Sequence, residues 1–134
     1  METTFAIIKP AAVADKHVGK ILTMIEDHGF EIAAMQKITM THAQAEELYQ
    51  EHKARPFFNG LVSIMTQSPI VILALKKENA ISSWRDLMGA TNPANALPGT
   101  IRALFGKNLD ANASHGSDSQ ASAARELGIF FPNL

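Results

Sequence analysis

Apolar residues recur along the chain with two periods, and these periods predict its strands and helices. Apolar segments predict buried strands at residues 4–9 and 69–76, and residues 32–40 are predicted to form a further strand. Apolar residues spaced three and four positions apart predict helices, because that spacing places them on one helical face. The predicted helices cover residues 18–28, 42–49, 58–65, 80–88 and 118–128, with one further helical turn at 101–105.

Polar residues mark where several of these helices begin. Thr41 with Gln44, and Ser117 with Gln120, have the spacing of a capping box, in which the two side chains bond free N–H groups of the first turn. Asn79 is the predicted N-cap of the helix at 80–88. The segment from Thr91 to Gly99 contains two prolines and a glycine, and it is predicted to form a loop.

The order of the elements predicts the fold class. Strand, helix, strand, helical hairpin, strand, helix, proline-containing loop, short strand and helix are typical of an α+β fold. The expected form is a ferredoxin-like split βαβ antiparallel sheet covered by helices, with the helical hairpin inserted. Periodicity supports these elements but leaves the strand order open. The length of 134 residues and a hydrophobic content of 46% predict a single domain spanning residues 1–134.

Composition narrows the possible partners. A net charge of −1 gives no general attraction for nucleic acid, so we expect no specific nucleic-acid partner. An anionic ligand would have to be held by a few converging cations. The absence of cysteine removes thiol chemistry and cysteine-based metal sites. The longest apolar run, Ile70 to Leu75, is far too short to span a membrane, so we expect no membrane association and a cytoplasmic location.

The densest polar segment, residues 112–119, contains His115 just before a predicted helix start. The free N–H groups at a helix N-terminus are suited to phosphate oxygens. A neutral imidazole has a free lone pair near neutral pH, so it can act as a nucleophile and divide a transfer into two half-reactions. The alternative is that His115 is an ordinary loop histidine, and the residues alone do not exclude it.

Cations that could meet a phosphate lie near the ends of predicted elements. Lys9 ends the first strand, while Arg85 and Arg102 flank the proline-containing loop, which could bring both guanidinium groups to one side. The alternative is that each is a solvated surface charge. No glycine-rich phosphate loop or metal-binding histidine–carboxylate spacing is present. The residues by themselves therefore predict a phosphate-handling enzyme or an anion-binding module.

The segment from Asn112 to Ser119 resembles the active-site signature of nucleoside diphosphate kinases, N-x-x-H-G-S-D-S. Three further segments are similar to this family in the same order along the chain. Residues 5–10 (FAIIKP) resemble its first strand, residues 55–62 (RPFFNGLV) its helical hairpin and residues 88–102 (MGATNPANALPGTIR) its proline-containing loop. The likeness thus extends over nearly the whole chain.

The resemblance implies a reaction and a set of roles. The γ-phosphate of a nucleoside triphosphate such as ATP would pass to a nucleoside diphosphate by a ping-pong mechanism, through a phosphohistidine. The nucleophile would be His115, supported by Tyr49, Ser117 and Glu126. The nucleotide would be held by Lys9, Phe57, Arg85, Thr91, Arg102 and Asn112. Mg²⁺ would arrive with the nucleotide phosphates, with Asp118 as a partner through water. The resemblance also implies a homo-oligomer built from dimers.

Three residues in two segments depart from the family pattern. Ala11 follows the Lys-Pro pair where an acidic residue is usual, and Ala103-Leu104 stand where Gly-Asp is usual. Neither departure falls on a residue with an expected chemical role, so both bear on local loop geometry, subunit contacts and stability. Two other functions stay open at this point. One is a catalytically silent nucleotide-binding or regulatory protein of the same fold, and the other is a phosphohistidine relay protein.

Overall fold

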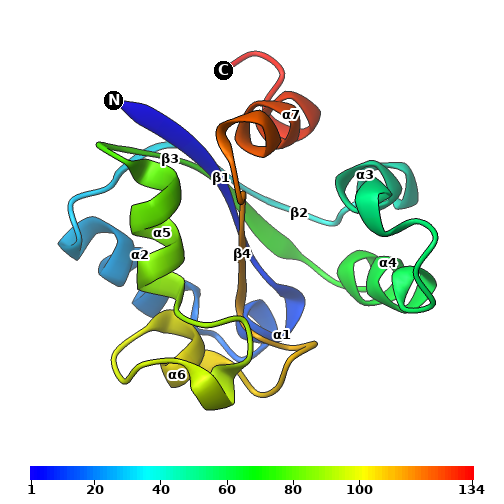
Figure 1. The fold of residues 1–134 in the computed structure, drawn as a ribbon, viewed down its shortest axis with the longest axis horizontal. Coiled ribbons are helices and arrows are strands. Elements are labelled where there is room, and N and C mark those ends of the chain that lie inside the picture. Colours follow the sequence, from blue (N-terminus) through cyan, green and yellow to red (C-terminus); the bar gives the residue numbers. More distant parts are fainter.

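The computed structural model describes residues 1–134 and contains one four-stranded sheet with helices on both faces (Figure 1). The strands are β1 (Glu2–Ile8), β2 (Glu31–Ile38), β3 (Ile70–Lys77) and β4 (Ser114–Gly116). Their order across the sheet is β2-β3-β1-β4, and every neighbouring pair is antiparallel. The α+β class and the ferredoxin-like arrangement predicted from the sequence are confirmed.

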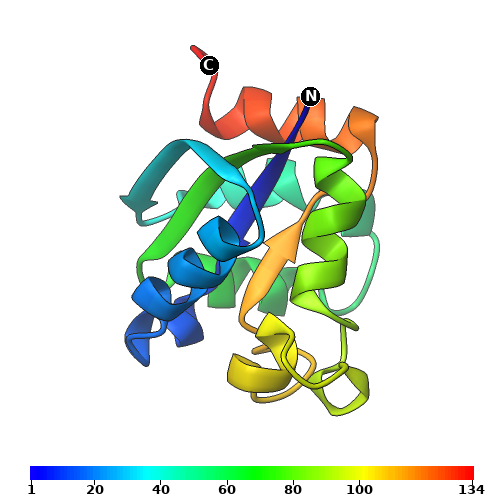
Figure 2. The same cartoon turned by 90° about the vertical axis from the view of Figure 1, so that its left-hand side faces the viewer.

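Helices cover the two faces of the sheet separately. The α-helices are α1 (Pro10–Ala14), α2 (Val18–Asp27), α3 (His42–Leu48), α4 (Phe58–Thr66), α5 (Ala80–Met88), α6 (Ile101–Phe105) and α7 (Gln120–Phe130). Two short 3₁₀ helices, η1 (Gln50–His52) and η2 (Pro93–Asn95), lie in the hairpin and in the proline-containing loop. In Figure 2, α2 and α5 lie in front of the sheet and α3 and α4 behind it. None of the helices is both long and apolar enough to cross a membrane.

Alternate side chains of the central strand β1 enter two different cores. Phe5 and Ile7 pack with residues of α3, α4 and α7, whereas Ala6 and Ile8 pack with residues of α2 and α5. A strand covered on both faces has no solvent side, which explains why residues 5–8 are all apolar instead of alternating with polar residues.

Several helix ends differ from the prediction. The chain turns directly from β1 into α1, which begins at Pro10; the sequence pattern had indicated only the end of the strand there. The capping box of Thr41 and Gln44 is present. The box predicted for Ser117 and Gln120 is wrong, because Ser119 is the N-cap of α7 and the helix continues to Phe130.

The N-cap predicted for α5 is also only partly correct. Asn79 occupies the position with a left-handed backbone, φ 53°, but its side chain makes no capping bond. The carboxylate of Glu2 accepts the Ile81 N–H instead, at 2.8 Å, and also accepts a bond from Gln120 at the start of α7. These hydrogen bonds keep the pKa of Glu2 below its ordinary value. A residue far away in sequence thus caps this helix.

Strand β4 presents successive residues to opposite faces of the sheet. Its register pairs Ile7 with His115 and Ala6 with Gly116. Side chains directly opposite across an antiparallel pair share a face, so His115 lies on the side of α3, α4 and α7. Gly116 lies on the α5 side, where a Cβ atom would come within 2.5 Å of the Trp84 ring. Glycine at this position therefore allows α5 to pack closely on β4.

Candidate active site

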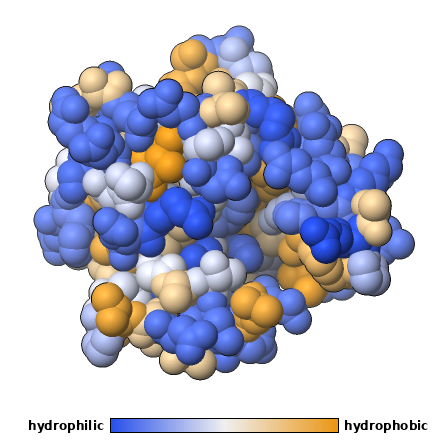
Figure 3. All heavy atoms as spheres, viewed as in Figure 1, coloured by the Kyte–Doolittle hydropathy of each residue, from blue (hydrophilic) through white to orange (hydrophobic).

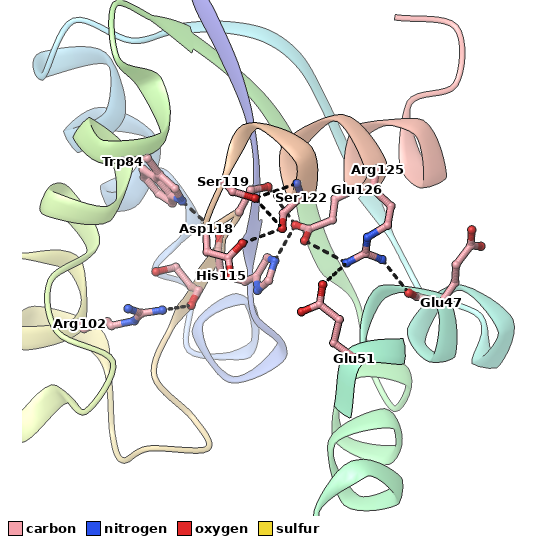
Figure 4. A network of polar contacts seen from close by, with 12 residues as sticks. Glu47, Glu51, Trp84, Arg102, His115, Asp118, Ser119, Ser122, Arg125 and Glu126 are labelled. Carbon is pink, nitrogen blue, oxygen red and sulfur yellow. Dashed lines mark hydrogen bonds and ion pairs between the residues drawn. The ribbon is translucent and has the colours of Figure 1, made fainter. Parts of the chain in front are cut away.

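The imidazole of His115 is held from one side by a buried carboxylate. Nε2 lies 3.0 Å from Oε1 of Glu126, which projects from α7 (Figure 4). The hydroxyl of Ser117 donates to the same oxygen at 2.9 Å. We name His115, Ser117 and Glu126 the histidine clamp. Because a carboxylate only accepts, Nε2 carries the proton of the neutral ring and Nδ1 keeps a lone pair.

The backbone around His115 is constrained on both sides. Ala113 has φ 76°, and the N–H of Ser114 bonds the carbonyl of Asn112 at 3.0 Å, which closes a γ-turn. A left-handed alanine of this kind is strained and needs support from its surroundings. That support includes a bond from the Lys9 N–H to the Ala113 carbonyl at 2.9 Å and one from Trp84 Nε1 to the His115 carbonyl at 3.2 Å.

Tyr49 closes another side of the His115 ring. Their ring centroids are 6.3 Å apart with an interplanar angle of 82°, so the two rings meet edge to face. The Tyr49 hydroxyl is buried and has no hydrogen-bond partner within the chain. Burial, and secondly the negative charge of Glu126, raises the pKa of Tyr49 above its ordinary value. The phenol is therefore a protonated donor with nothing to bond in the free protein.

A cleft of about 470 Å³ opens between α5 and the proline-containing loop, and Arg85, Thr91 and Arg102 are among its lining residues. Arg102 is only 8% exposed. Its Nη1 donates to the Gly89 carbonyl at 3.0 Å and its Nη2 to the Ser114 carbonyl at 2.9 Å. Its Nε is buried and has no hydrogen-bond partner. Burial, and then the charge of Arg85, lowers the pKa of Arg102 to about 10.

Lys9 lies beside this cleft and is connected to it through two hydrogen bonds. Its Nζ donates to Asn112 Oδ1 at 2.8 Å, and the amide of Asn112 donates to the carbonyl of Thr91 at 3.0 Å. Burial, and then the charge of Arg102, lowers the pKa of Lys9 to about 8. We name Lys9, Arg85 and Arg102 the cation group. None of the three forms an ion pair, while the more distant carboxylates of Asp110 and Asp118 act electrostatically on Lys9 and Arg85.

Two of the expected site residues, Phe57 and Asp118, belong neither to the cleft lining nor to the histidine clamp. Phe57 is 52% exposed in the loop between α3 and α4, with its ring 5.5 Å from that of His52. Asp118 is exposed at the start of α7, where its carboxylate accepts a bond from the Ser122 hydroxyl at 2.6 Å. This bond is the largest of several causes, the Arg85 charge among them, that lower the pKa of Asp118.

Figure 3 shows the face of the molecule that is seen in Figure 1. Its middle is hollowed, and hydrophilic residues predominate around the hollow.

The first turn of α7 differs from what the sequence indicated. A free helix N-terminus was expected directly behind His115, but the helix starts at Gln120 and the Ser119 hydroxyl accepts the Ser122 N–H. The Ser117 hydroxyl is bound to Glu126 and its N–H to the Phe5 carbonyl, so Ser117 extends the strand. The contact of Glu126 with His115 was expected only from the family resemblance, and the structure contains it.

Two constrained positions gave no sequence signal. One is Ala113, because nothing in the pattern marks a left-handed alanine. The other is Arg125, which lies next to Glu126 in α7 and contacts residues 47 and 51 of the hairpin. Its adjacency to Glu126 does not predict this contact, because neighbouring residues on a helix point in different directions.

The class of protein follows from an imidazole that a buried carboxylate holds beside a group of cations that form no ion pair. Cations without ion pairs in a cleft indicate an anionic ligand, and a free imidazole nitrogen beside them indicates transfer of a phosphoryl group. The fold and the site thus define a phosphate-transferring enzyme.

Comparisons with known proteins narrow this class. The family model "Nucleoside diphosphate kinase" matches residues 2–134. The nucleoside diphosphate kinase of Trichlorobacter lovleyi is 59% identical over 131 residues, with 98% of this chain and 95% of the relative covered. That of Geotalea uraniireducens is 57% identical over 134 residues, with 100% and 98% covered.

Solved structures agree. The Aquifex aeolicus nucleoside diphosphate kinase has a TM-score of 0.95 at 39% identity, covering 97% of this chain and 94% of that one. A Halobacterium salinarum nucleoside diphosphate kinase in complex with CDP has a TM-score of 0.95 at 36% identity, covering 98% and 88%. The chain belongs to the nucleoside diphosphate kinase family. It is a transferase that acts on nucleotides.

Proposed function

We propose that this enzyme transfers the terminal phosphate of a nucleoside triphosphate such as ATP to a nucleoside diphosphate through a phosphohistidine on Nδ1 of His115. The observation that carries the proposal is the 3.0 Å contact between Nε2 and Glu126, which leaves Nδ1 as the nitrogen with a lone pair. Nδ1 forms a bond to the γ-phosphorus while the bond from that phosphorus to the bridging oxygen breaks. The nucleoside diphosphate leaves with the electron pair.

The histidine clamp stabilises the positively charged ring that this step produces. Phosphorylation at Nδ1 leaves a positively charged imidazole ring, because Nε2 keeps its proton. The Glu126 carboxylate, 4% exposed, is already in contact with that nitrogen and stabilises the charge as it develops. The return half-reaction runs in reverse, with a terminal oxygen of the acceptor diphosphate attacking the same phosphorus. Donor and acceptor therefore occupy the same site in turn, which makes the kinetics ping-pong.

The cation group supplies positive charge for the phosphates. Arg85 and Arg102 line the cleft with Thr91, and Lys9 adjoins it through Asn112. Phosphoryl transfer depends mainly on positioning and on neutralising charge, and none of these cations is held in an ion pair with a carboxylate of the chain. Tyr49, whose ring packs edge to face on His115 and whose hydroxyl has no partner, would donate to the bound phosphoryl group.

A divalent cation, in our proposal Mg²⁺, accompanies the nucleotide. The chain has no group of three or more His, Cys, Asp or Glu residues placed to hold a metal ion. Mg²⁺ commonly takes its ligands from substrate phosphates, waters and one or two carboxylates, so a single nearby carboxylate fits. Asp118, whose lowered pKa keeps it ionised, would serve through water. When bound, the ion neutralises phosphate charge; the residues of the chain do the orienting.

The nucleotide base and sugar have fewer candidate contacts. Exposed Phe57 offers an aromatic face for stacking, which every base can use. Asn112 and Lys9 lie near the sugar hydroxyls in this scheme. We therefore propose that purine and pyrimidine nucleotides, ribo and deoxy, are all substrates. The CDP complex of the Halobacterium salinarum relative is consistent with a pyrimidine in a site of this fold.

We also propose a homo-oligomer built from dimers, a single domain over residues 1–134 and a cytoplasmic location, where nucleotide pools are found. Strand β2 is an edge of the sheet and exposes most of its side chains, Met35 among them, so a second copy could extend the sheet. The single-domain proposal rests on one sheet whose central strand contributes to both cores.

The two other functions considered from the sequence fit the site less well. A silent binding protein has no need for a histidine clamp, and a phosphohistidine relay has no need for the cation group.

Steady-state kinetics with ATP, Mg²⁺ and the eight common nucleoside diphosphates tests the proposal. We expect parallel double-reciprocal lines, and loss of activity in His115→Asn but not in the control His42→Asn, whose histidine is exposed at the start of α3. Intersecting lines, or an active His115→Asn protein, would contradict the mechanism.

A further inference from the structure

Glu126 has one oxygen that the histidine clamp does not use. Oε1 is shared by His115 and Ser117, whereas Oε2 lies 3.7 Å from Nη2 of Arg125. The side chain of Glu126 is nearly inaccessible to water, and a buried carboxylate requires compensation by charge. Apart from His115 itself, Arg125 is the only cation in an ion pair with it.

The rest of the Arg125 guanidinium is bound to the helical hairpin. Nη1 donates to the carbonyl of Glu47 at 2.9 Å, in the last turn of α3, where carbonyls have no partner within the helix. Nη2 also lies 3.8 Å from the exposed carboxylate of Glu51 in η1. Figure 4 shows the guanidinium of Arg125 between Glu126 on α7 and these two residues.

The hairpin segment held by Arg125 also contains Tyr49. Its ring meets the His115 ring edge to face, and its hydroxyl is buried without a partner. One guanidinium thus connects two groups that touch His115: the carboxylate at Nε2 and the segment that carries the phenol. The bond to Glu47 joins residues that are 78 positions apart, so local structure does not maintain it, whereas Glu126 is the neighbour of Arg125 in α7.

We propose that Arg125 is a positioning residue for phosphorylation of His115. It orients the Glu126 carboxylate toward Nε2 and fixes the Tyr49 segment against the ring. The proposal rests on the function proposed above. Loss of Arg125 should slow the chemical step more than it weakens nucleotide binding, because the guanidinium is directed at Glu126 and the hairpin and is absent from the cleft lining.

The test compares Arg125→Met, Arg125→Lys and the control Lys53→Met in the same hairpin, where Lys53 is exposed and forms no ion pair. The single-turnover rate of His115 phosphorylation is measured with saturating ATP and Mg²⁺, alongside nucleotide KM and melting temperature. We expect about a tenfold lower rate in Arg125→Met, the effect of losing one charge-assisted contact, with KM unchanged. Arg125→Lys should recover part of the rate, and Lys53→Met should match the parent.

A second readout separates positioning from simple bracing of the fold. The ¹⁵N shifts of the His115 ring report which nitrogen carries the proton, and we expect the Nε2-protonated form to decrease in Arg125→Met. A parent-like rate and tautomer in that variant would overturn the proposal, as would a rate loss with an unchanged tautomer. If Arg125→Met does not fold, a parent-like rate in Arg125→Lys overturns it. Failure of the parent protein itself to phosphorylate His115 would instead refute the proposed function.

Discussion

On the α5 side of β4, Arg85 and Arg102 line a cleft that Lys9 adjoins, and none of these three cations forms an ion pair. On the α7 side, a single carboxylate has a partner for each of its oxygens. Burial and mutual repulsion lower the pKa values of Lys9 and Arg102. Glu126 instead contacts His115, Ser117 and Arg125. Groups proposed to hold a substrate have no ion pair until the substrate arrives, whereas the carboxylate that holds the nucleophile has charged partners within the fold. Burial without an ion pair destabilises the free protein at Lys9, whereas Arg102 is compensated in part by its bonds to the backbone.

The largest expected effect comes from the two arginines of the cleft. Arg85→Met and Arg102→Met should each lower kcat/KM about 100-fold, because each removes a charge-assisted phosphate contact of roughly 1.5–3 kcal/mol. They should differ in stability. Arg85 is exposed, so its loss should change the free energy of unfolding little.

Arg102 donates to the carbonyls of Gly89 and Ser114 on either side of the site, so its loss should destabilise the fold by about 1–3 kcal/mol. Chemical denaturation of both variants measures the difference. Equal stabilities would show that the Arg102 bonds to the backbone contribute nothing, and an unchanged kcat/KM would remove that arginine from the site.

The next effect concerns Lys9 and has opposite signs for activity and stability. In the folded protein its pKa is about 8 instead of the usual 10.5, so the folded state binds fewer protons than the unfolded state between these values. Stability should therefore rise as the pH increases through this window, and below about 8 the native state bears the whole penalty. That penalty is roughly 3 kcal/mol, partly offset by the bond to Asn112.

Lys9→Met should consequently be more stable than the parent near neutral pH, by about 1–2 kcal/mol, while losing at least about tenfold in kcat/KM. The stability gain should shrink toward pH 10. Urea unfolding at several pH values, with Lys16→Met as an exposed control, gives the answer. A less stable Lys9→Met protein would mean that the buried charge of Lys9 does not destabilise the fold.

The smallest effect is expected at Phe57, which belongs to neither region. Phe57→Ala should raise nucleotide KM about tenfold, the lower part of the range for base stacking, and to the same extent for purines and pyrimidines. Because the ring is 52% exposed, the free energy of unfolding should change little. Comparison of KM for GDP and CDP in the variant is decisive: an effect confined to one base would indicate that Phe57 recognises base identity.

Local patterns sufficed for most helices and strands, because each pattern reflects the burial of one surface, but they did not predict α1. The helix faces and the apolar strands follow from residues a few positions apart, and the Thr41–Gln44 box formed as predicted because nothing else binds those side chains. The Ser117 box did not form because Glu126 takes the Ser117 hydroxyl, and the N-cap bond expected from Asn79 is replaced by one to Glu2. In both cases a partner distant in sequence decided the outcome.

In the site, too, some residues could be found from local sequence and others depend on partners distant in sequence. The polar segment around His115 and the flanking arginines could be found in the sequence, but the periodicity did not give the strand register that turns His115 toward α7. The approach of Glu126 was implied only by the family resemblance. Arg125 and the γ-turn at Ala113 depend on contacts between separate elements and on backbone strain, which leave no mark in composition or spacing.

The most direct test of the account is to locate the phosphate on the His115 ring. The protein, labelled with ¹⁵N, is incubated with ATP and Mg²⁺ without an acceptor, and coupling between phosphorus and nitrogen identifies the phosphorylated atom. We predict an acid-labile, alkali-stable phosphate on Nδ1 of His115, with Nε2 still protonated against Glu126. Phosphate on Nε2, or a His115→Asn protein that still becomes phosphorylated, would contradict the role assigned to the histidine clamp.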